Sequence, residues 1–149
     1  MRKINIVLYS PEIPQNTGNI ARLCACTGAS LYLVGKLGFS LSSKYTKRAG
    51  LDYWESVDIH RVHSLDELQA EHVGSKFYYM TTKSKKIYTD IKFCDGDFLV
   101  FGPESRGLPQ EYVSQETAIT LPMQDGQRSL NLSNSVAITV YEVIRQIGL

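Results

Sequence analysis

The sequence predicts an α/β protein built as a single domain on one parallel β-sheet, with helices on both faces. Short and nearly continuous apolar segments recur along the 149 residues, and turns and helix-like patterns separate them. Apolar segments of this kind are typical of strands that are buried on both faces. Strands that alternate with helices favour parallel pairing. The chain length suits one hydrophobic core, and the sequence shows no internal repeat or low-complexity segment.

Five apolar segments are predicted as strands. They occupy residues 4–9, 31–34, 76–82, 97–102 and 117–123. The first helix is expected between the first two strands, where Ile20 and Cys24 lie on one apolar face. Asn16 or Thr17 would cap its N-terminus, and Gly28 would end it.

Two further helices follow from capping signals and apolar spacing. Ser64 and Glu67 form a capping box that opens a helix over residues 64–70. The last helix carries apolar side chains at helical spacing, namely Val136, Val140, Val143, Ile144 and Ile147. A dense polar cluster precedes it, made of Ser129, Asn131, Ser133 and Asn134. One helix needs one such cap, so the density of the cluster indicates a second role.

Composition and cysteine content indicate an ordinary intracellular protein. No apolar segment reaches the length of a membrane span, and the N-terminal segment lacks the features of a signal peptide. We therefore expect a cytoplasmic location. The cysteines Cys24, Cys26 and Cys94 are expected to be reduced and to act as small buried side chains.

The net charge is only +1, but the charges are unevenly distributed. Residues 13–51 and 72–89 contain lysines, and the first of these segments also arginines, but neither contains Asp or Glu. Such a chain can present a basic face to the phosphate backbone of a nucleic acid. The charge distribution alone supports this interpretation and that of an ordinary solvated surface equally. The segment 35–48 shows no clear pattern and is expected to be a mobile loop or a short helix that carries basic residues.

Gly, Pro, Asn and Ser gather in the segments that follow the predicted strands, such as SPEIPQNTGN, GPESRGLP and PMQDGQRSLNLSN. Ligands of parallel sheets bind at the carboxyl ends of the strands, so these loops predict one site built from several segments. Within the first helix, Arg22 shares a face with Gly18 and Asn19, away from the apolar face. The helix dipole disfavours a cation there, which indicates either a phosphate or hydroxyl ligand or a surface pair with Glu12.

Other chemistries find little support. Gly102 in FGPESRGLP would allow a ligand to approach the backbone, although the pattern alone favours a tight turn. The glycine spacing differs from that of phosphate-binding loops and dinucleotide fingerprints. His60 and His63 lack completing ligands, so no metal site is predicted. Ser129 lacks the surroundings of a catalytic serine, which argues against a hydrolase.

Together, PQNTGNIAR, FGPESRGLP and LPM…RSLNLSNSVAITVYE resemble the three motifs of the SPOUT class of RNA methyltransferases. The resemblance covers essentially the whole chain. It is closest to a compact branch that methylates the ribose 2′-hydroxyl of the tRNA wobble nucleotide, a cytidine or a modified uridine. It implies a C-terminal deep trefoil knot that holds S-adenosyl-L-methionine. The segment QRSLNLSN would be the knot loop, whose Ser and Asn groups line the cofactor pocket as well as cap the last helix.

The resemblance also implies the residues of the site. The implied cofactor-binding residues are Met80, Thr81, Gly102, Glu104, Leu121, Met123, Ser129 and Leu130. The implied catalytic residues are Arg22, Asn19, Glu104, Ser129 and Asn131. In this interpretation Arg22 orients the 2′-hydroxyl or stabilises the developing alkoxide, and the others, with Asn16, position donor and acceptor.

The implied partners are the anticodon stem-loop of tRNA and a second copy of the chain, with Arg22 reaching from the partner subunit. The candidates for RNA contact are Lys44, Lys47, Arg48, Lys83, Lys85, Lys86, Arg106, Arg128 and Tyr141, the last of which faces either RNA or the dimer partner. No metal is implied. The alternatives are a related enzyme that acts on ribosomal RNA, a non-catalytic RNA-binding module, and a flavodoxin-like flavin protein.

Overall fold

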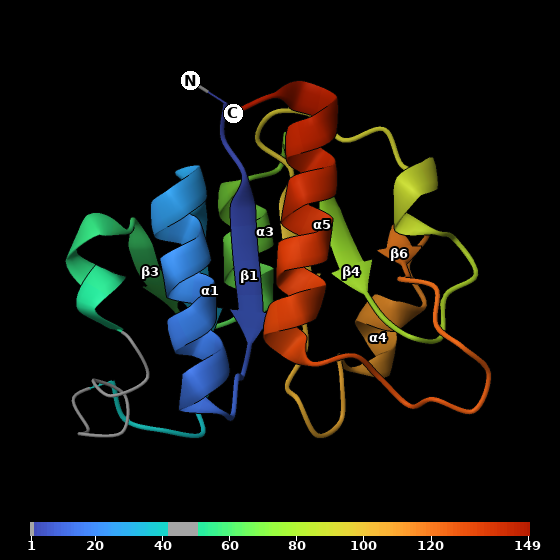
Figure 1. Ribbon diagram of the computed structural model, residues 1–149, viewed down its shortest axis with the longest axis horizontal. Coiled ribbons are helices and arrows are strands. Elements are labelled where there is room, and N and C mark those ends of the chain that lie inside the picture. The colour runs from blue at the N-terminus through green and yellow to red at the C-terminus, as the bar shows by residue number, and fades with distance from the viewer. Residues whose placement is uncertain (1, 42–50) are drawn as a thin grey trace.

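A parallel β-sheet of six strands forms the centre of the protein (Figure 1). The computed structural model describes residues 2–41 and 51–149. The strands are β1 (Asn5–Tyr9), β2 (Ser30–Val34), β3 (Ile59–Val62), β4 (Phe77–Met80), β5 (Phe98–Phe101) and β6 (Ala118–Ile119). They lie in the order β3-β2-β1-β5-β4-β6, and every neighbouring pair is parallel. The predicted parallel sheet is confirmed.

Helices cover both faces of this sheet, as predicted. The helical elements are α1 (Pro14–Thr27), η1 (Leu51–Ser56), α3 (Leu65–Glu71), η2 (Tyr88–Asp90), α4 (Gln110–Val113) and α5 (Leu132–Ile147). Figure 1 shows α1 and α5 side by side in front of the sheet, with α3 behind it. Apolar side chains of α3 and α4 belong to one cluster, and those of α1 and α5 belong to the other. Within the described residues, no helix is long and apolar enough to cross a membrane.

The central strand β1 explains why the sequence shows continuous apolar segments instead of alternation. Ile6 and Leu8 belong to the apolar cluster shared with α1 and α5, whereas Val7 belongs to the cluster shared with α3 and α4. Successive side chains of a strand point to opposite faces, and all three of these are fully buried. A strand covered on both sides therefore carries apolar residues at consecutive positions.

The start of the first helix differs from the prediction, whereas its end agrees. The helix begins at Pro14, earlier than either predicted cap, and its N-cap residue Ile13 makes no side-chain cap bond. Proline suits the first helical position because it has no N–H to leave unpaired and its φ is already helical. Asn16 consequently lies inside the first turn and is buried. Gly28 ends the helix as predicted, with a φ of 75° and its N–H bonded to the carbonyl oxygen of Cys24.

Strand predictions failed at β3, which was missed, and in the segment 117–123, where the strand is shorter than predicted. Strand β3 was not predicted because it lies at the sheet edge and its central residues His60 and Arg61 are exposed, which removes the apolar pattern. The segment 117–123 contributes only β6 to the sheet. Pro122 cannot donate a ladder hydrogen bond, and Leu121 already lines a pocket.

Two other expectations require correction or limitation. The three cysteines are free thiols, but only Cys24 is buried, whereas Cys26 and Cys94 are exposed. Cys26 lies two residues from Cys24 on α1, which turns it to the opposite face of the helix. Of the segment 35–48, the described part up to residue 41 contains no helix, and Leu37 and Leu41 pack against the core. Residues 42–48 lie outside the described residues.

Candidate active site

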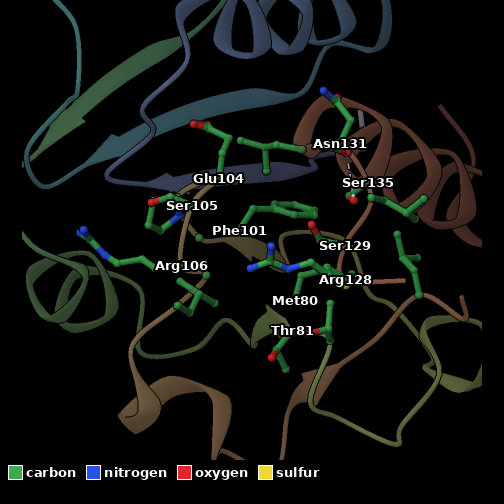
Figure 2. Close-up of a pocket in the computed structure, with 18 of the residues that line it drawn as sticks. Met80, Thr81, Phe101, Glu104, Ser105, Arg106, Arg128, Ser129, Asn131 and Ser135 are labelled. Atoms are coloured by element: carbon green, nitrogen blue, oxygen red, sulfur yellow. Dashed lines mark hydrogen bonds between the residues drawn. The ribbon is translucent and has the colours of Figure 1, made fainter. Parts of the chain in front are cut away.

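The carboxyl ends of the strands carry a pocket of about 480 Å³ (Figure 2). Its walls come from the segments that follow β4, β5 and β6, with contributions from the beginnings of α1 and α5. This position agrees with the prediction that several loops build one site. We call this cavity the strand-end pocket.

Apolar and polar groups share the lining of the strand-end pocket. Phe101 is the last residue of β5, and Figure 2 shows Met80, Arg128 and Ser129 gathered around its ring, while Arg106 extends away from them. Leu121 and Leu130 add further apolar surface. A cavity that combines apolar walls with placed polar groups suits a small-molecule ligand.

The turn after β5 requires glycine at position 102. A Cβ on Gly102 would lie 2.4 Å from both the carbonyl carbon of Gly107 and the nitrogen of Leu108. The N–H of Gly107 also donates to the carbonyl oxygen of Pro103 at 2.9 Å, which closes the loop on itself. The tight turn that the sequence favoured is therefore present, and it forms one wall of the strand-end pocket.

Two glutamates fasten the loop after β1 to the loop after β5. The carboxylate of Glu104 accepts hydrogen bonds from the backbone N–H groups of Glu12 and Ile13, both at 2.8 Å. In return, the carboxylate of Glu12 accepts from the N–H of Ser105 at 2.8 Å and from its hydroxyl at 2.9 Å. We call this arrangement the carboxylate clasp. Glu104 thereby satisfies the two backbone N–H groups that immediately precede α1.

The clasp gives its two carboxyl groups opposite pKa shifts. Burial raises the pKa of Glu104 above its usual value, although the N–H groups of Glu12 and Ile13 act against this shift. The N–H and hydroxyl of Ser105, followed by the charge of Arg106, lower the pKa of Glu12. Glu104 also lines the strand-end pocket, so it joins the pocket wall to the first helix.

Asn131 joins the beginnings of the two helices that cover one face. It is the N-cap of α5, and its side-chain oxygen accepts from the N–H of Asn134 at 3.2 Å and the hydroxyl of Ser133 at 2.6 Å. Its amide nitrogen donates to the side-chain oxygen of Asn16 at 3.1 Å. Asn131 therefore does more than cap α5, because it also ties α5 to α1, a link that the sequence did not predict. Ser129 from the same cluster lines the strand-end pocket.

The structure gathers most, but not all, of the predicted site residues. Around the strand-end pocket lie all eight predicted cofactor residues, Met80, Thr81, Gly102, Glu104, Leu121, Met123, Ser129 and Leu130. Asn131 and Asn16 also line it. Asn19 and Arg22 are exposed together on α1, and they are not among the described residues that line the pocket. Their shared face is as predicted.

The predicted RNA-contact residues are more widely spread. Lys83, Arg106 and Arg128 line the strand-end pocket. Lys85, Lys86 and Tyr141 are exposed elsewhere, and Lys86 donates to the carbonyl oxygen of Glu116 at 2.8 Å. Lys44, Lys47 and Arg48 lie outside the described residues.

Several lining residues were missed by sequence reasoning. Phe101, Thr120, Leu132 and Ser135 all face the strand-end pocket. Phe101 and Thr120 could have been found from the rule that ligands bind at strand ends, since the one ends β5 and the other follows β6. Leu132 and Ser135 belong to the first turn of α5, whose approach to the pocket depends on the path of the whole C-terminal segment.

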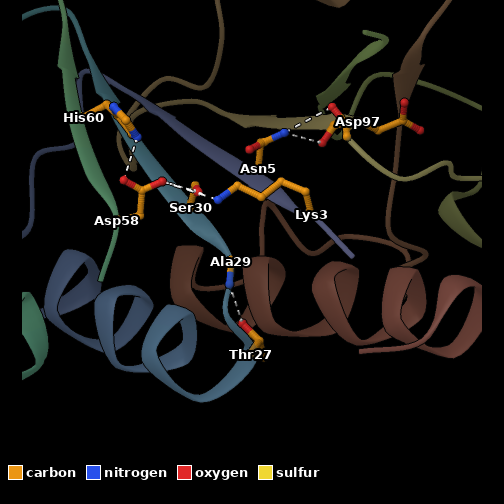
Figure 3. A network of polar contacts seen from close by, with 9 residues as sticks. Lys3, Asn5, Thr27, Ala29, Ser30, Asp58, His60 and Asp97 are labelled. Carbon is orange, nitrogen blue, oxygen red and sulfur yellow. Dashed lines mark hydrogen bonds and ion pairs between the residues drawn. The ribbon is translucent and has the colours of Figure 1, made fainter. Parts of the chain in front are cut away.

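The described residues contain no group of three or more His, Cys, Asp or Glu side chains that could hold a metal ion. His60 instead contacts Asp58, with Nε2 and Oδ1 2.9 Å apart, and stacks on Tyr32 with a centroid distance of 4.6 Å. Figure 3 shows that Asp58 also meets Ser30 and Lys3. This network lies at the amino ends of the strands, the opposite edge from the strand-end pocket.

Comparison with known proteins adds independent information. The family model described as the SpoU rRNA Methylase family matches residues 3–141. The chain is 50% identical to a tRNA (cytidine(34)-2'-O)-methyltransferase of Methylovorus glucosotrophus (strain SIP3-4) over 145 residues, covering 95% of this chain and 94% of the relative. It is 44% identical to the protein of that name from Escherichia coli (strain K12), covering 97% of this chain and 94% of the relative.

A solved structure described as giving structural insights into the 2-OH methylation of C/U34 on tRNA shares the architecture, with a TM-score of 0.92 and 43% sequence identity. The alignment covers 98% of this chain and 97% of that chain. The likeness therefore extends beyond the sheet to nearly the whole chain.

Proposed function

The chain belongs to the SpoU rRNA methylase family, and we propose that it transfers a methyl group from S-adenosyl-L-methionine to the ribose 2′-hydroxyl of the pyrimidine at position 34 of tRNA. The observation that carries the proposal is the extent of the likeness. Relatives named for this reaction are 44% and 50% identical to the chain over nearly their whole length.

The strand-end pocket suits the proposed methyl donor. Its volume of about 480 Å³ lies in the range of small-molecule sites. Met80, Leu121 and Leu130 would flank the adenine, and the hydroxyl of Ser129 and the backbone around Gly102 would bind polar groups. When bound, S-adenosyl-L-methionine supplies a methyl group that its positive sulfur has already activated.

The residues of the chain must then activate the acceptor. A ribose hydroxyl is a poor nucleophile until its proton is partly removed. We assign Arg22 to orient this hydroxyl and to stabilise the negative charge that develops on its oxygen, because a guanidinium stays protonated and is a poor base. Since Arg22 and Asn19 lie on the exposed side of α1, the proposal places them at the strand-end pocket of the partner subunit in a homodimer.

We also propose that the segment QRSLNLSN, residues 127–134, forms the loop of a C-terminal knot that leads into α5. The chain leaves β6, the last strand at one side of the sheet, and continues to α5, which packs beside α1. The Asn131–Asn16 bond then fixes the end of that return path against the first helix.

Methyl transfer to tRNA tests the function. Labelled S-adenosyl-L-methionine and bulk tRNA from a strain lacking the gene should yield a 2′-O-methylated pyrimidine at position 34, identified by mass spectrometry. Arg22→Ala should lower the rate of transfer by at least about a hundredfold, while calorimetry shows unchanged binding of S-adenosylhomocysteine. Lys92→Ala, on the loop before β5, is the matched exposed-cation control and should retain activity.

The other outcomes distinguish the alternatives. Transfer to ribosomal RNA but not to tRNA would support S-adenosyl-L-methionine as the methyl donor and show that the proposed tRNA substrate is wrong. Binding of RNA without binding of S-adenosylhomocysteine would indicate a non-catalytic RNA-binding module.

A further inference from the structure

A second pocket lies at the carboxyl ends of β2 and β3, on the same side of the sheet as the strand-end pocket. It has a volume of about 360 Å³ and is lined by Gly35, Lys36, Arg61, Val62 and His63. None of these residues lines the strand-end pocket, and none is among the residues predicted to contact RNA. We call it the β2–β3 pocket.

The guanidinium of Arg61 is held in place by the backbone that it crosses. Nη1 donates to the carbonyl oxygen of Leu33 at 2.9 Å, and Nη2 donates to that of Gly35 at 3.2 Å. These two bonds use only some of the N–H donors of a guanidinium. A cation that is already fixed loses less side-chain entropy when it binds an anion, so Arg61 is prepared for a ligand.

The turn that brings Lys36 to the β2–β3 pocket is also fixed. Gly35 has a φ of +78°, and a Cβ there would lie 2.8 Å from the hydroxyl oxygen of Ser10. Its N–H donates to the carbonyl oxygen of Val62 at 3.1 Å, which extends the pairing of β2 and β3 by one step. Lys36 follows immediately and is exposed, as is His63 on the facing strand end.

The charges of the β2–β3 pocket favour an anion. Lys36 and Arg61 carry permanent positive charges at neutral pH, and His63 can donate an imidazole N–H. No Asp or Glu is found among the described residues that line it. Together these groups offer several converging donors to a phosphate oxygen.

We propose that the β2–β3 pocket binds one phosphodiester group of the RNA, away from the nucleotide that is methylated. This inference rests on the proposed function, because it places the contact relative to the strand-end pocket. Neighbouring strands are about 4.8 Å apart, so the gap between β2 and β3 lies about 12 Å along the edge from β5. An RNA strand bound at the strand-end pocket can reach that distance within a few nucleotides.

Paired substitutions test the assignment. In the full-length enzyme, Lys36→Gln with His63→Gln should raise the KM for tRNA about three- to tenfold and leave kcat unchanged. The slope of log affinity against log salt, measured by fluorescence anisotropy with an anticodon stem-loop, should become shallower by about one. Arg61 is kept in this variant because its bonds to the backbone also support the fold. Lys92→Gln is the control and should leave the KM and the salt slope unchanged.

A second measurement separates an RNA phosphate from a free one. Inorganic phosphate, titrated into labelled protein, should shift the amide NMR signals of Gly35 and Val62 in the unmodified chain and not in the paired variant. If phosphate binds there while RNA affinity is unchanged in the variant, the pocket serves a free anion and the RNA assignment is wrong. Unchanged RNA affinity together with no phosphate binding would also overturn it.

The proposed function fails independently of this inference. It fails if the unmodified chain transfers no methyl group to tRNA, whereas the RNA-binding and phosphate measurements remain interpretable in that case.

Discussion

Gly102 shows how a single residue without a side chain shapes the strand-end pocket. The contacts that a Cβ would make are with backbone atoms of Gly107 and Leu108, which cannot rotate away as a flexible side chain would. The wall made by residues 102–108 would have to move instead. Because the pocket is lined by backbone as well as by side chains, its shape depends on this turn.

We therefore expect Gly102→Ala to weaken binding of S-adenosylhomocysteine by at least about tenfold, measured by calorimetry. Overlap of this kind typically costs about 1–3 kcal/mol. A tenfold loss of affinity corresponds to about 1.4 kcal/mol, which lies within that range. Gly74→Ala is the matched control, since a Cβ there would meet nothing within 4 Å. Equal affinity of both variants would show that the turn is not part of the binding wall.

At the amino ends of the strands, the interactions of Asp58 make the stability of the fold depend on pH in the acid range. The hydroxyl of Ser30, followed by His60, lowers the pKa of Asp58 to about 2 (Figure 3). The folded-state pKa lies below the unfolded value, so the ionised carboxylate stabilises the fold above about pH 4. That contribution is lost as the pH falls through the folded-state pKa. The side chain is half exposed, so solvent screening limits the effect to about 0.5 kcal/mol.

Asp58→Asn should accordingly lower the free energy of unfolding by about 0.5 kcal/mol at pH 7, and the difference should approach zero near pH 2. Urea unfolding at both pH values measures it. Glu55→Gln, at an exposed position nearby in the sequence, should show little difference at either pH. A difference for Asp58→Asn that persists unchanged at pH 2 would contradict the assignment.

Among the elements, α1 and α5 depend on one another through their first turns. Asn131 caps α5 with its side-chain oxygen and binds Asn16 of α1 with its amide nitrogen. Asn131→Ala should lower the free energy of unfolding by about 1–2 kcal/mol, since both the cap and the partner of a buried amide are lost. Chemical unfolding at pH 7 measures the change.

Two further substitutions separate these contributions. Asn131→Asp keeps the capping oxygen and removes the donor to Asn16, so it should retain part of the lost stability. Asn134→Ala keeps the backbone N–H that donates to the Asn131 side-chain oxygen. It should lower the free energy of unfolding by less than about 0.5 kcal/mol. If Asn131→Asp and Asn131→Ala were equally unstable, the link between the helices would outweigh the cap.

The elements also show what the sequence could and could not predict. The central strands and α5 were predictable because burial imposes a regular apolar pattern on residues such as Leu8 and Val140. The start of α1 was not, because the N–H groups just before it bond to Glu104, which is distant in the sequence, instead of to a local side chain. Ser129 and Leu130 were placed at the site by family resemblance, whereas Phe101 was missed although its position at the end of β5 could have indicated it.

For the molecule as a whole, the exposed apolar side chains of α5 indicate that two copies of the chain associate. Ile138 and Tyr141 lie one helical turn apart and remain 40% and 52% exposed. Large apolar side chains that remain together at the surface commonly mark an interface. We expect the unmodified chain to sediment as a dimer, and Ile138→Glu with Tyr141→Ala to sediment as a monomer that has lost methyl transfer.

Val73→Gln is the control for this experiment, because Val73 is 88% exposed but lies on the other side of the sheet, after α3. It should remain dimeric and active. A monomeric unmodified chain would remove the reason to place Arg22 in the partner subunit.

The carboxylate clasp also has a consequence for the synthesis of the protein. Its two halves are separated by about 90 residues in the chain, as in the bond from Glu12 to Glu104. At roughly 5–20 residues per second, the ribosome needs between about 5 and 20 seconds to make the second half after the first. During that interval the nascent chain has no closed site, and α5 is made later still. Cofactor binding thus marks a finished polypeptide, and a stalled, incomplete chain is expected to be unable to capture the methyl donor.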